Sequence, residues 1–146
     1  AFNEKNCDSK IPSLTKFNSD DAKILDNYTK NLDTLRGYID KQKLNSYVDF
    51  IVNSLFEANK YFNDQEPWKK KDDQNRLNSI LYVSLELIRK ISILLFPIIP
   101  DSSLKALSMF DIKEKDISLN TIKDHNLLKP NDYVKKIEIL FKKIAK

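Results

Sequence analysis

The stretch that decides the fold runs from Asp73 to Pro97 and reads DQNRLNSILYVSLELIRKISILLFP. It contains no glycine, and its single proline is the last residue. Its apolar residues recur at steps of three and four, which is the spacing of one face of an α-helix. The second half is apolar on nearly every side, as expected of a helix that other helices surround. The stretch therefore predicts a central helix from about Asp73 to Leu95, which ends ahead of the proline.

A second amphipathic segment precedes this helix. Between Leu44 and Pro67 an apolar stripe with helical spacing is interrupted by Asn59, and its members are Leu44, Val48, Ile51, Val52, Leu55, Phe56 and Phe62. We predict a helix that stops before Pro67, because the residue before a proline disfavours helical geometry. Its stripe should pack against the central helix. The shared core is expected to contain Leu55, Phe56, Leu81, Leu85 and Ile88.

Shorter helical patterns flank the two long ones. Ser19 is followed by two aspartates, which is typical of a helix start: the hydroxyl can cap free N–H groups, and the acids favour the positive end of the helix dipole. This helix is predicted to reach about Tyr38. Pro100 is expected to start a short helix after the central one. Residues 1–18 and 110–132 show no sustained period, which predicts irregular structure there.

The composition agrees with a helical protein. The 146 residues include one glycine and five prolines, too few for an all-β protein with many tight turns. We predict an all-α fold in the form of a helical bundle. The bundle is expected to span residues 1–110. Residues 111–146 are expected to form a C-terminal extension that packs back on the bundle or toward a domain outside the chain.

Residue counts exclude several kinds of site. Cys7 and His125 are the only cysteine and histidine, so no intrachain disulfide can form and a zinc site of the usual ligand set is not expected. Gly37 is the only glycine, which excludes a glycine-rich phosphate loop. We therefore predict no catalytic residue and no metal ligand in this chain. No apolar run approaches the roughly 18–20 residues that span a bilayer, so no membrane partner is expected.

The charge leaves two interpretations open. The net charge is +4 and the sequence pI is about 9.0, which favours an anionic partner. Charged residues of both signs are nevertheless mixed along the chain, as on the solvated surface of any helical protein.

The segment after the second helix carries the strongest functional indication. Residues 58–68 read ANKYFNDQEPW, which places the only tryptophan, Trp68, directly after Pro67. Lysines follow at 69–71, and Arg76 comes a few residues later. An aromatic ring at an exposed helix end can stack on an unpaired base while nearby cations neutralise phosphates. A simpler interpretation is also open, in which Trp68 caps the core, the lysines are solvated and Asn59 is a buried, hydrogen-bonded core residue.

These residues resemble segments of methionyl-tRNA synthetases. Residues 58–68 are similar to that family's ANKYxxxxxPW segment, and residues 81–100 to its LxxxxExLRxxxILLxPxxP segment. Residues 5–12, KNCDSKIP, resemble the stretch that follows the first helix of the family's anticodon domain. The resemblance covers most of residues 5–110, and the order of its pieces makes it specific. The chain departs from the family after the Pro-Trp pair, where lysines follow directly and the loop is shorter.

The resemblance implies a helical bundle of the class I aminoacyl-tRNA synthetase anticodon-binding type, which recognises the CAU anticodon of methionine tRNA. In such a domain Trp68 would stack on the anticodon, Pro67 would hold it at the helix end, and Asn59 would support the corner. The residues expected to contact phosphates are Lys69, Lys70, Lys71 and Arg76. The family's asparagine and arginine that read the first anticodon base lie on a helix that would precede Ala1, so they are not carried over.

The implied parent protein is a cytoplasmic, ATP-dependent methionine–tRNA ligase. Its catalytic domain, which uses ATP and magnesium, would be a partner outside this chain. The family's adenylation signatures are absent here, so the chain alone is expected not to activate methionine and to hold no cofactor. Residues 136–144 resemble the family's KPEPLFPRI segment, which predicts a packed return segment. The alternative function is a helical protein-interaction or scaffold bundle without a nucleic-acid role, for which Trp68 should be buried and the lysines dispersed.

Overall fold

The computed structural model describes residues 2–14, 16–125, 127–136 and 140. Within them the α-helices are α1 (Phe2–Cys7), α2 (Ser19–Lys30), α3 (Leu32–Asp40), α4 (Leu44–Gln65), α5 (Gln74–Leu95) and α6 (Pro100–Ser108). Short 3-10 helices are η1 (Pro67–Lys69), η2 (Glu114–Asp116) and η3 (Leu119–Lys123). The described residues form no strand, only an isolated β-bridge between Lys10 and Tyr133, so the predicted all-α bundle is confirmed. None of the described helices is long and apolar enough to cross a membrane.

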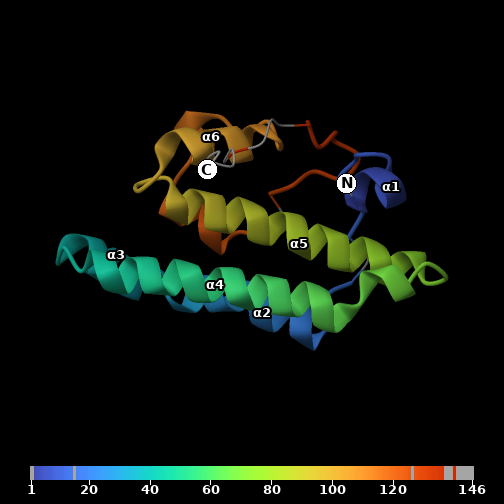
Figure 1. Ribbon diagram of the computed structural model, residues 1–146, viewed down its shortest axis with the longest axis horizontal. Helices are drawn as coiled ribbons and strands as arrows, with labels where there is room; N and C mark the ends of the chain where they lie inside the picture. The colour runs from blue at the N-terminus through green and yellow to red at the C-terminus, as the bar shows by residue number, and fades with distance from the viewer. Residues whose placement is uncertain (1, 15, 126, 137–139, 141–146) are drawn as a thin grey trace, which may run out of the picture.

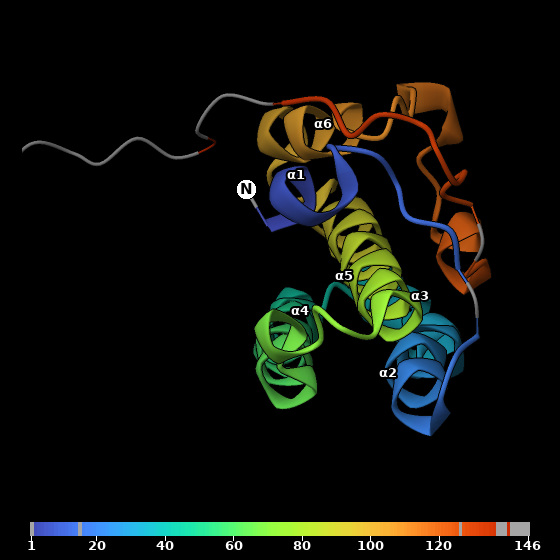
Figure 2. The same cartoon turned by 90° about the vertical axis from the view of Figure 1, so that its right-hand side faces the viewer.

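The stretch predicted as the central helix is α5, and it lies at the centre of the molecule. In Figure 1 it runs between a layer formed by α2, α3 and α4 and a layer that contains α6. Figure 2, turned by 90°, shows α5 above the space between α2 and α4. Most of its side chains are buried. The predicted start is confirmed as well, because the carboxylate of Asp73 accepts a hydrogen bond from the backbone N–H of Arg76 at 3.0 Å.

The helix predicted from Ser19 to about Tyr38 is two helices, so that prediction was wrong. Asn31 ends α2, and its side chain donates to the carbonyl of Asn27 at 2.8 Å, which competes with continuation of the helix. The cap is also one residue earlier than predicted. Asn18 accepts from the N–H of Asp21 at 2.9 Å while the carboxylate of Asp21 accepts from the N–H of Asn18 at 3.0 Å, which is a capping box.

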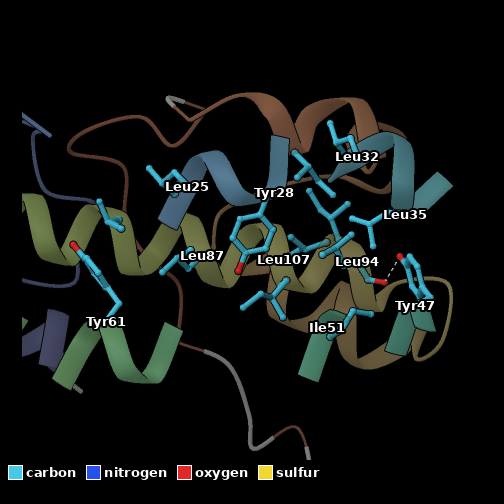
Figure 3. Close-up of a cluster of buried hydrophobic side chains, with 14 of the residues drawn as sticks. Leu25, Tyr28, Leu32, Leu35, Tyr47, Ile51, Tyr61, Leu87, Leu94 and Leu107 are labelled. Carbon is cyan, nitrogen blue, oxygen red and sulfur yellow. Dashed lines mark hydrogen bonds between the residues drawn. The ribbon is translucent and has the colours of Figure 1, made fainter. Parts of the chain in front are cut away.

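The buried face of α4 differs from the predicted stripe. Its buried residues recur at helical spacing, and three of the four end in a hydroxyl group: Tyr47, Ile51, Ser54 and Tyr61. The predicted core residues Leu55, Phe56 and Ile88 are 42%, 69% and 41% exposed, so that part of the prediction was wrong, whereas Leu81 and Leu85 are buried. The polar tips are satisfied inside the core: the hydroxyl of Tyr47 donates to the carbonyl of Leu94 at 2.7 Å. Figure 3 shows this pair among the aliphatic residues of the cluster.

The exposure of Phe56 gives a prediction about stability. Phe56→Ala should lower the free energy of unfolding by less than about 1 kcal/mol, because a side chain that is 69% exposed loses little buried area. Leu87→Ala is the control, since Leu87 is 2% exposed and should cost about 2–5 kcal/mol. Urea denaturation of the two variants measures both values. Equal losses would show that Phe56 is buried in solution.

The segments at the two ends pack on the bundle together. Residues 1–18 were predicted to be irregular, but they contain α1. The backbone N–H of Ile11 donates to the carbonyl of Asp132 at 2.8 Å, and the N–H of Val134 donates to the carbonyl of Ser9 at 2.6 Å. Ile122 is buried as well. Residues 111–125 and 127–136 of the extension therefore pack back on the bundle. The predicted return segment falls largely on residues 137–139 and 141–146, outside the described part of the chain.

Three charged side chains on α5 are buried beneath the C-terminal segment: Glu86, Arg89 and Lys90. Arg89 donates to the carboxylate of Glu86 at 2.8 and 3.0 Å, and to the carbonyls of Thr121 and Asp124 at 3.1 and 2.7 Å. Lys90 donates to the carbonyl of Asp124 at 2.6 Å. Arg89 and Lys90 thus donate hydrogen bonds to backbone carbonyls of a segment that has no strand or long helix to pair them. These hydrogen bonds hold residues 121–124 against α5.

Candidate nucleic-acid interface

The corner between α4 and α5 presents the tryptophan. Glu66 ends α4 in the left-handed conformation, with φ 46° and ψ 57°, so the chain turns sharply there. The next three residues form η1, closed by a hydrogen bond from the N–H of Lys69 to the carbonyl of Glu66 at 2.9 Å. Pro67 is buried, whereas Trp68 is 43% exposed. The prediction that Trp68 lies partly exposed just beyond the helix end is confirmed.

One side of the indole is supported by another aromatic ring. The ring centroids of Trp68 and Phe62 lie 6.3 Å apart at an interplanar angle of 56°. Phe62 in turn contacts Phe2 of α1 edge to face, with centroids 5.8 Å apart. The indole therefore lies at the end of an aromatic row, with part of its surface available to a ligand.

The predicted cationic residues after Trp68 are in different environments. The ammonium of Lys69 is paired with the carboxylate of Glu66 at 2.6 Å; the Lys69 side chain is exposed and that of Glu66 is partly exposed. Lys70 is half-buried and Lys71 is exposed, and neither forms a salt bridge within the described part of the chain. Two exposed acids, Asp72 and Asp73, follow directly and reduce the local positive charge.

Arg76 points inward, toward a buried acid. Its guanidinium donates to both oxygens of Asp21, at 2.6 and 2.9 Å, and to the side-chain oxygen of Gln65 at 2.5 Å. Asp21 is fully buried, and it also accepts from the hydroxyl of Tyr61 at 2.6 Å. Burial alone would raise the pKa of Asp21, but the hydrogen bonds from Arg76 and Tyr61 outweigh it and hold that pKa below its ordinary value. The phosphate contact expected of Arg76 stays a prediction.

Asn59 is not where it was expected. It is exposed, and its side chain makes no hydrogen bond with the described residues, so the expectation of a buried, hydrogen-bonded residue beneath the corner was wrong. It lies on the side of α4 that lines an apolar groove with Leu55 and Ile88. Asp21, Tyr61 and Arg76 lie beneath the corner instead. Only the capping role of Asp21 is visible in the sequence, because an acid in the first turn of a helix favours its positive end; its pairing with Arg76 is not.

Comparison with known proteins identifies the family of this chain. Residues 11–146 match the family described as the anticodon binding domain of methionyl tRNA ligase. The chain belongs to this family. The bundle described above is thus an anticodon-binding domain of the methionyl-tRNA ligase type, as the resemblance of residues 58–68 and 81–100 had indicated.

Curated relatives and solved structures agree with the family. The chain is 38% identical over 109 residues to a methionine–tRNA ligase of Brucella suis, covering 74% of the chain and 21% of that relative. It is 30% identical over 146 residues to the methionine–tRNA ligase of Thermotoga maritima, covering 99% of the chain and 23% of the relative. The apo crystal structure of Mycobacterium tuberculosis methionyl-tRNA synthetase superposes with a TM-score of 0.88 at 27% identity, covering 99% of this chain and 30% of that one. The chain therefore spans between a fifth and a third of the proteins that it matches.

Proposed function

We propose that this domain binds the anticodon stem-loop of methionine tRNA and recognises its CAU anticodon for a parent methionine–tRNA ligase. The observation that carries the proposal is the partly exposed Trp68, held at the end of α4 in a domain of this family. An unpaired base could stack on the free side of the indole, because RNA is read chiefly through splayed loop bases. The scaffold alternative required a buried Trp68, so the observed exposure favours RNA binding.

The parent enzyme would supply the chemistry. Attachment of methionine would take place in a catalytic domain outside this chain, which would use ATP as a substrate and magnesium as a cofactor. The part assigned to the bundle is recognition alone: it would hold the anticodon so that the other end of the tRNA reaches the catalytic domain.

A titration tests the proposal directly. The chain has one tryptophan and six tyrosines, so fluorescence excited where only tryptophan absorbs comes from Trp68. Its change on adding an anticodon stem-loop of methionine tRNA reports contact at Trp68. We expect saturable quenching by the CAU stem-loop and weaker binding by a stem-loop whose anticodon is altered. Equal affinities for both loops would contradict recognition of the anticodon, and no binding to either would contradict the proposed function.

The lysines beside the indole give a second prediction. Replacing Lys69, Lys70 and Lys71 together by glutamine should weaken stem-loop binding and reduce its salt dependence. Each phosphate contact on a single strand contributes roughly 0.7 to the log–log slope of affinity against salt, so losing two to three contacts should lower the slope by about 1.4–2.1. Fluorescence titrations at several salt concentrations, over roughly a sixfold range, measure this slope.

A matched control separates local contacts from net charge. Lys30, Lys41 and Lys43 are exposed and lie away from the Trp68 corner, and replacing them by glutamine removes the same charge. We expect this control to change the slope far less than the triple variant at residues 69–71. The same slope in both variants would show that the lysines act only through the overall charge of the domain.

A further inference from the structure

The corner that presents Trp68 is closed at its base by a hydrogen bond. Gln65 is the last residue of α4 and Arg76 lies in the first turn of α5, so these two residues stand on either side of the turn that contains Trp68. The guanidinium of Arg76 donates to the side-chain oxygen of Gln65 at 2.5 Å. This contact joins the two helix ends directly, and the segment 66–73 projects beyond it.

The same guanidinium is fixed to a buried carboxylate on a third helix. Asp21, in the first turn of α2, accepts four hydrogen bonds: from Arg76 at 2.6 and 2.9 Å, from the hydroxyl of Tyr61 at 2.6 Å and from the backbone of Asn18 at 3.0 Å. Tyr61 lies one turn before Gln65 on α4. The start of α2, the end of α4 and the start of α5 therefore meet at one carboxylate.

We propose that Arg76 and Asp21 are positioning residues that hold the Pro67-Trp68 corner in the orientation that receives an RNA base. The inference rests on the proposed function, and it assigns a role to two residues beneath the corner rather than to the base-stacking ring itself. A planar guanidinium can donate to Asp21 and Gln65 at the same time because its N–H groups form a rigid fork.

The geometry favours positioning over a direct phosphate contact. The side chain of Arg76 is 18% exposed, and its two terminal nitrogens already donate to Asp21 and Gln65. A phosphate bound by Arg76 would have to displace the buried carboxylate of Asp21, whose only other donors among the described residues are Tyr61 and the backbone N–H of Asn18. A corner that is held before RNA arrives has less conformational freedom to lose on binding, which increases affinity.

Two variants distinguish positioning from an effect of charge, because charge alone predicts no loss of RNA binding in either variant. Arg76→Lys keeps the positive charge and loses the fork. Asp21→Asn removes a negative charge, which by itself would strengthen RNA binding. If the residues position the corner, both variants should bind the stem-loop about 2- to 10-fold more weakly, the range expected when one side chain must be ordered on binding. The salt slope should stay unchanged in Arg76→Lys.

The free chain supplies a readout that does not depend on RNA. Trp68 is the only tryptophan, so acrylamide quenching and anisotropy of fluorescence excited where tyrosine does not absorb report on the corner. We expect greater quenching and lower anisotropy for Trp68 in Arg76→Lys and in Asp21→Asn, with helical circular dichroism retained. Gln65→Ala, at a half-buried position, provides a third variant that should loosen Trp68 even if Asp21→Asn does not fold.

The outcomes separate this inference from the proposed function. Unchanged quenching of Trp68 in Arg76→Lys and Gln65→Ala would overturn the positioning role. Loosened tryptophan with unchanged stem-loop affinity would overturn its relevance to RNA. A wild-type chain that binds no stem-loop would refute the proposed function, and the quenching data would still decide whether Arg76 holds the corner.

Discussion

Arg89→Met is expected to lower the free energy of unfolding by about 3–5 kcal/mol, the usual result of breaking a buried ion pair from one side. Arg89 and Glu86 have side chains that are 1% and 0% exposed, so the carboxylate left behind could not be solvated by water. The variant would also take a side-chain donor from the carbonyl of Thr121, whereas the carbonyl of Asp124 would keep the hydrogen bond from Lys90. Since a domain of this size is typically stable by only about 5–15 kcal/mol, the loss should be plain in urea denaturation.

The chain offers a matched control on its surface. Arg36 and Asp33 have the same spacing as Arg89 and Glu86 and a similar distance, 2.9 Å, but their side chains are 41% and 97% exposed. Arg36→Met should therefore cost about 0–1 kcal/mol, even though Arg36 also donates to Asn120 in an exposed contact. Similar losses in Arg36→Met and Arg89→Met would contradict the burial of the pair on α5.

A double variant checks the physical reason. Removing both charges, in Glu86→Met with Arg89→Met, should be less destabilising than removing Arg89 alone, because no uncompensated carboxylate remains. The double variant also removes the carboxylate 3.7 Å from Lys90, but burial is the main cause that lowers the pKa of Lys90, so this side chain can lose its proton instead of remaining an unpaired charge. A double variant that is less stable than Arg89→Met would show that the carbonyl contacts, rather than the charge of Glu86, dominate.

The long helices could be predicted because their boundaries are local in the sequence. Prolines limit α4, α5 and α6, and Asp73 caps α5 through its own neighbours. The break at Asn31 could not be predicted in this way. Asparagine is tolerated inside helices, and only its competing side-chain hydrogen bond at 2.8 Å shows that the chain turns there.

The buried face of α4 could not be predicted from apolar residues alone. Tyr47, Ser54 and Tyr61 are polar by type, but their hydroxyls find partners, and their apolar parts then pack in the core. Counting only aliphatic residues and phenylalanine selected a neighbouring stripe that contains Leu55 and Phe56. Both stripes have helical spacing, so only the tertiary structure decides between them.

The candidate site was predictable in its exposed part and not in its support. Pro67 ends α4 whatever the rest of the chain does, so the place of Trp68 follows from two adjacent residues. The support comes from Asp21 and Arg76, which are 55 positions apart. Each is an ordinary surface residue by type, and nothing in the sequence pairs them. Asn59 attracted attention because it interrupts an apolar stripe, but that stripe is largely exposed.

Trp68→Ala should weaken binding of the methionine anticodon stem-loop by about 5- to 150-fold, because stacking of one base on an aromatic ring contributes roughly 1–3 kcal/mol. The domain should remain folded. The indole is 43% exposed and packs on one ring, that of Phe62, with centroids 6.3 Å apart, so its removal takes away little core area. Calorimetry measures the affinity without the fluorescence of Trp68, and thermal melts followed by circular dichroism measure the stability.

Phe56→Ala is the control for this variant, because Phe56, inside α4, is also an aromatic residue with an exposed side chain, at 69%. It should leave stem-loop affinity unchanged, since Phe56 lies in the middle of α4 and not in the turn that presents Trp68. Trp68→Phe should retain part of the affinity, because a smaller ring still offers a π face. A capping role for Trp68 would give the opposite pair of results: a sharp fall in melting temperature, with normal binding by the fraction that remains folded. Such a result would refute stacking on Trp68, whereas a stable variant that has lost affinity would establish that the corner acts through the exposed side of its indole.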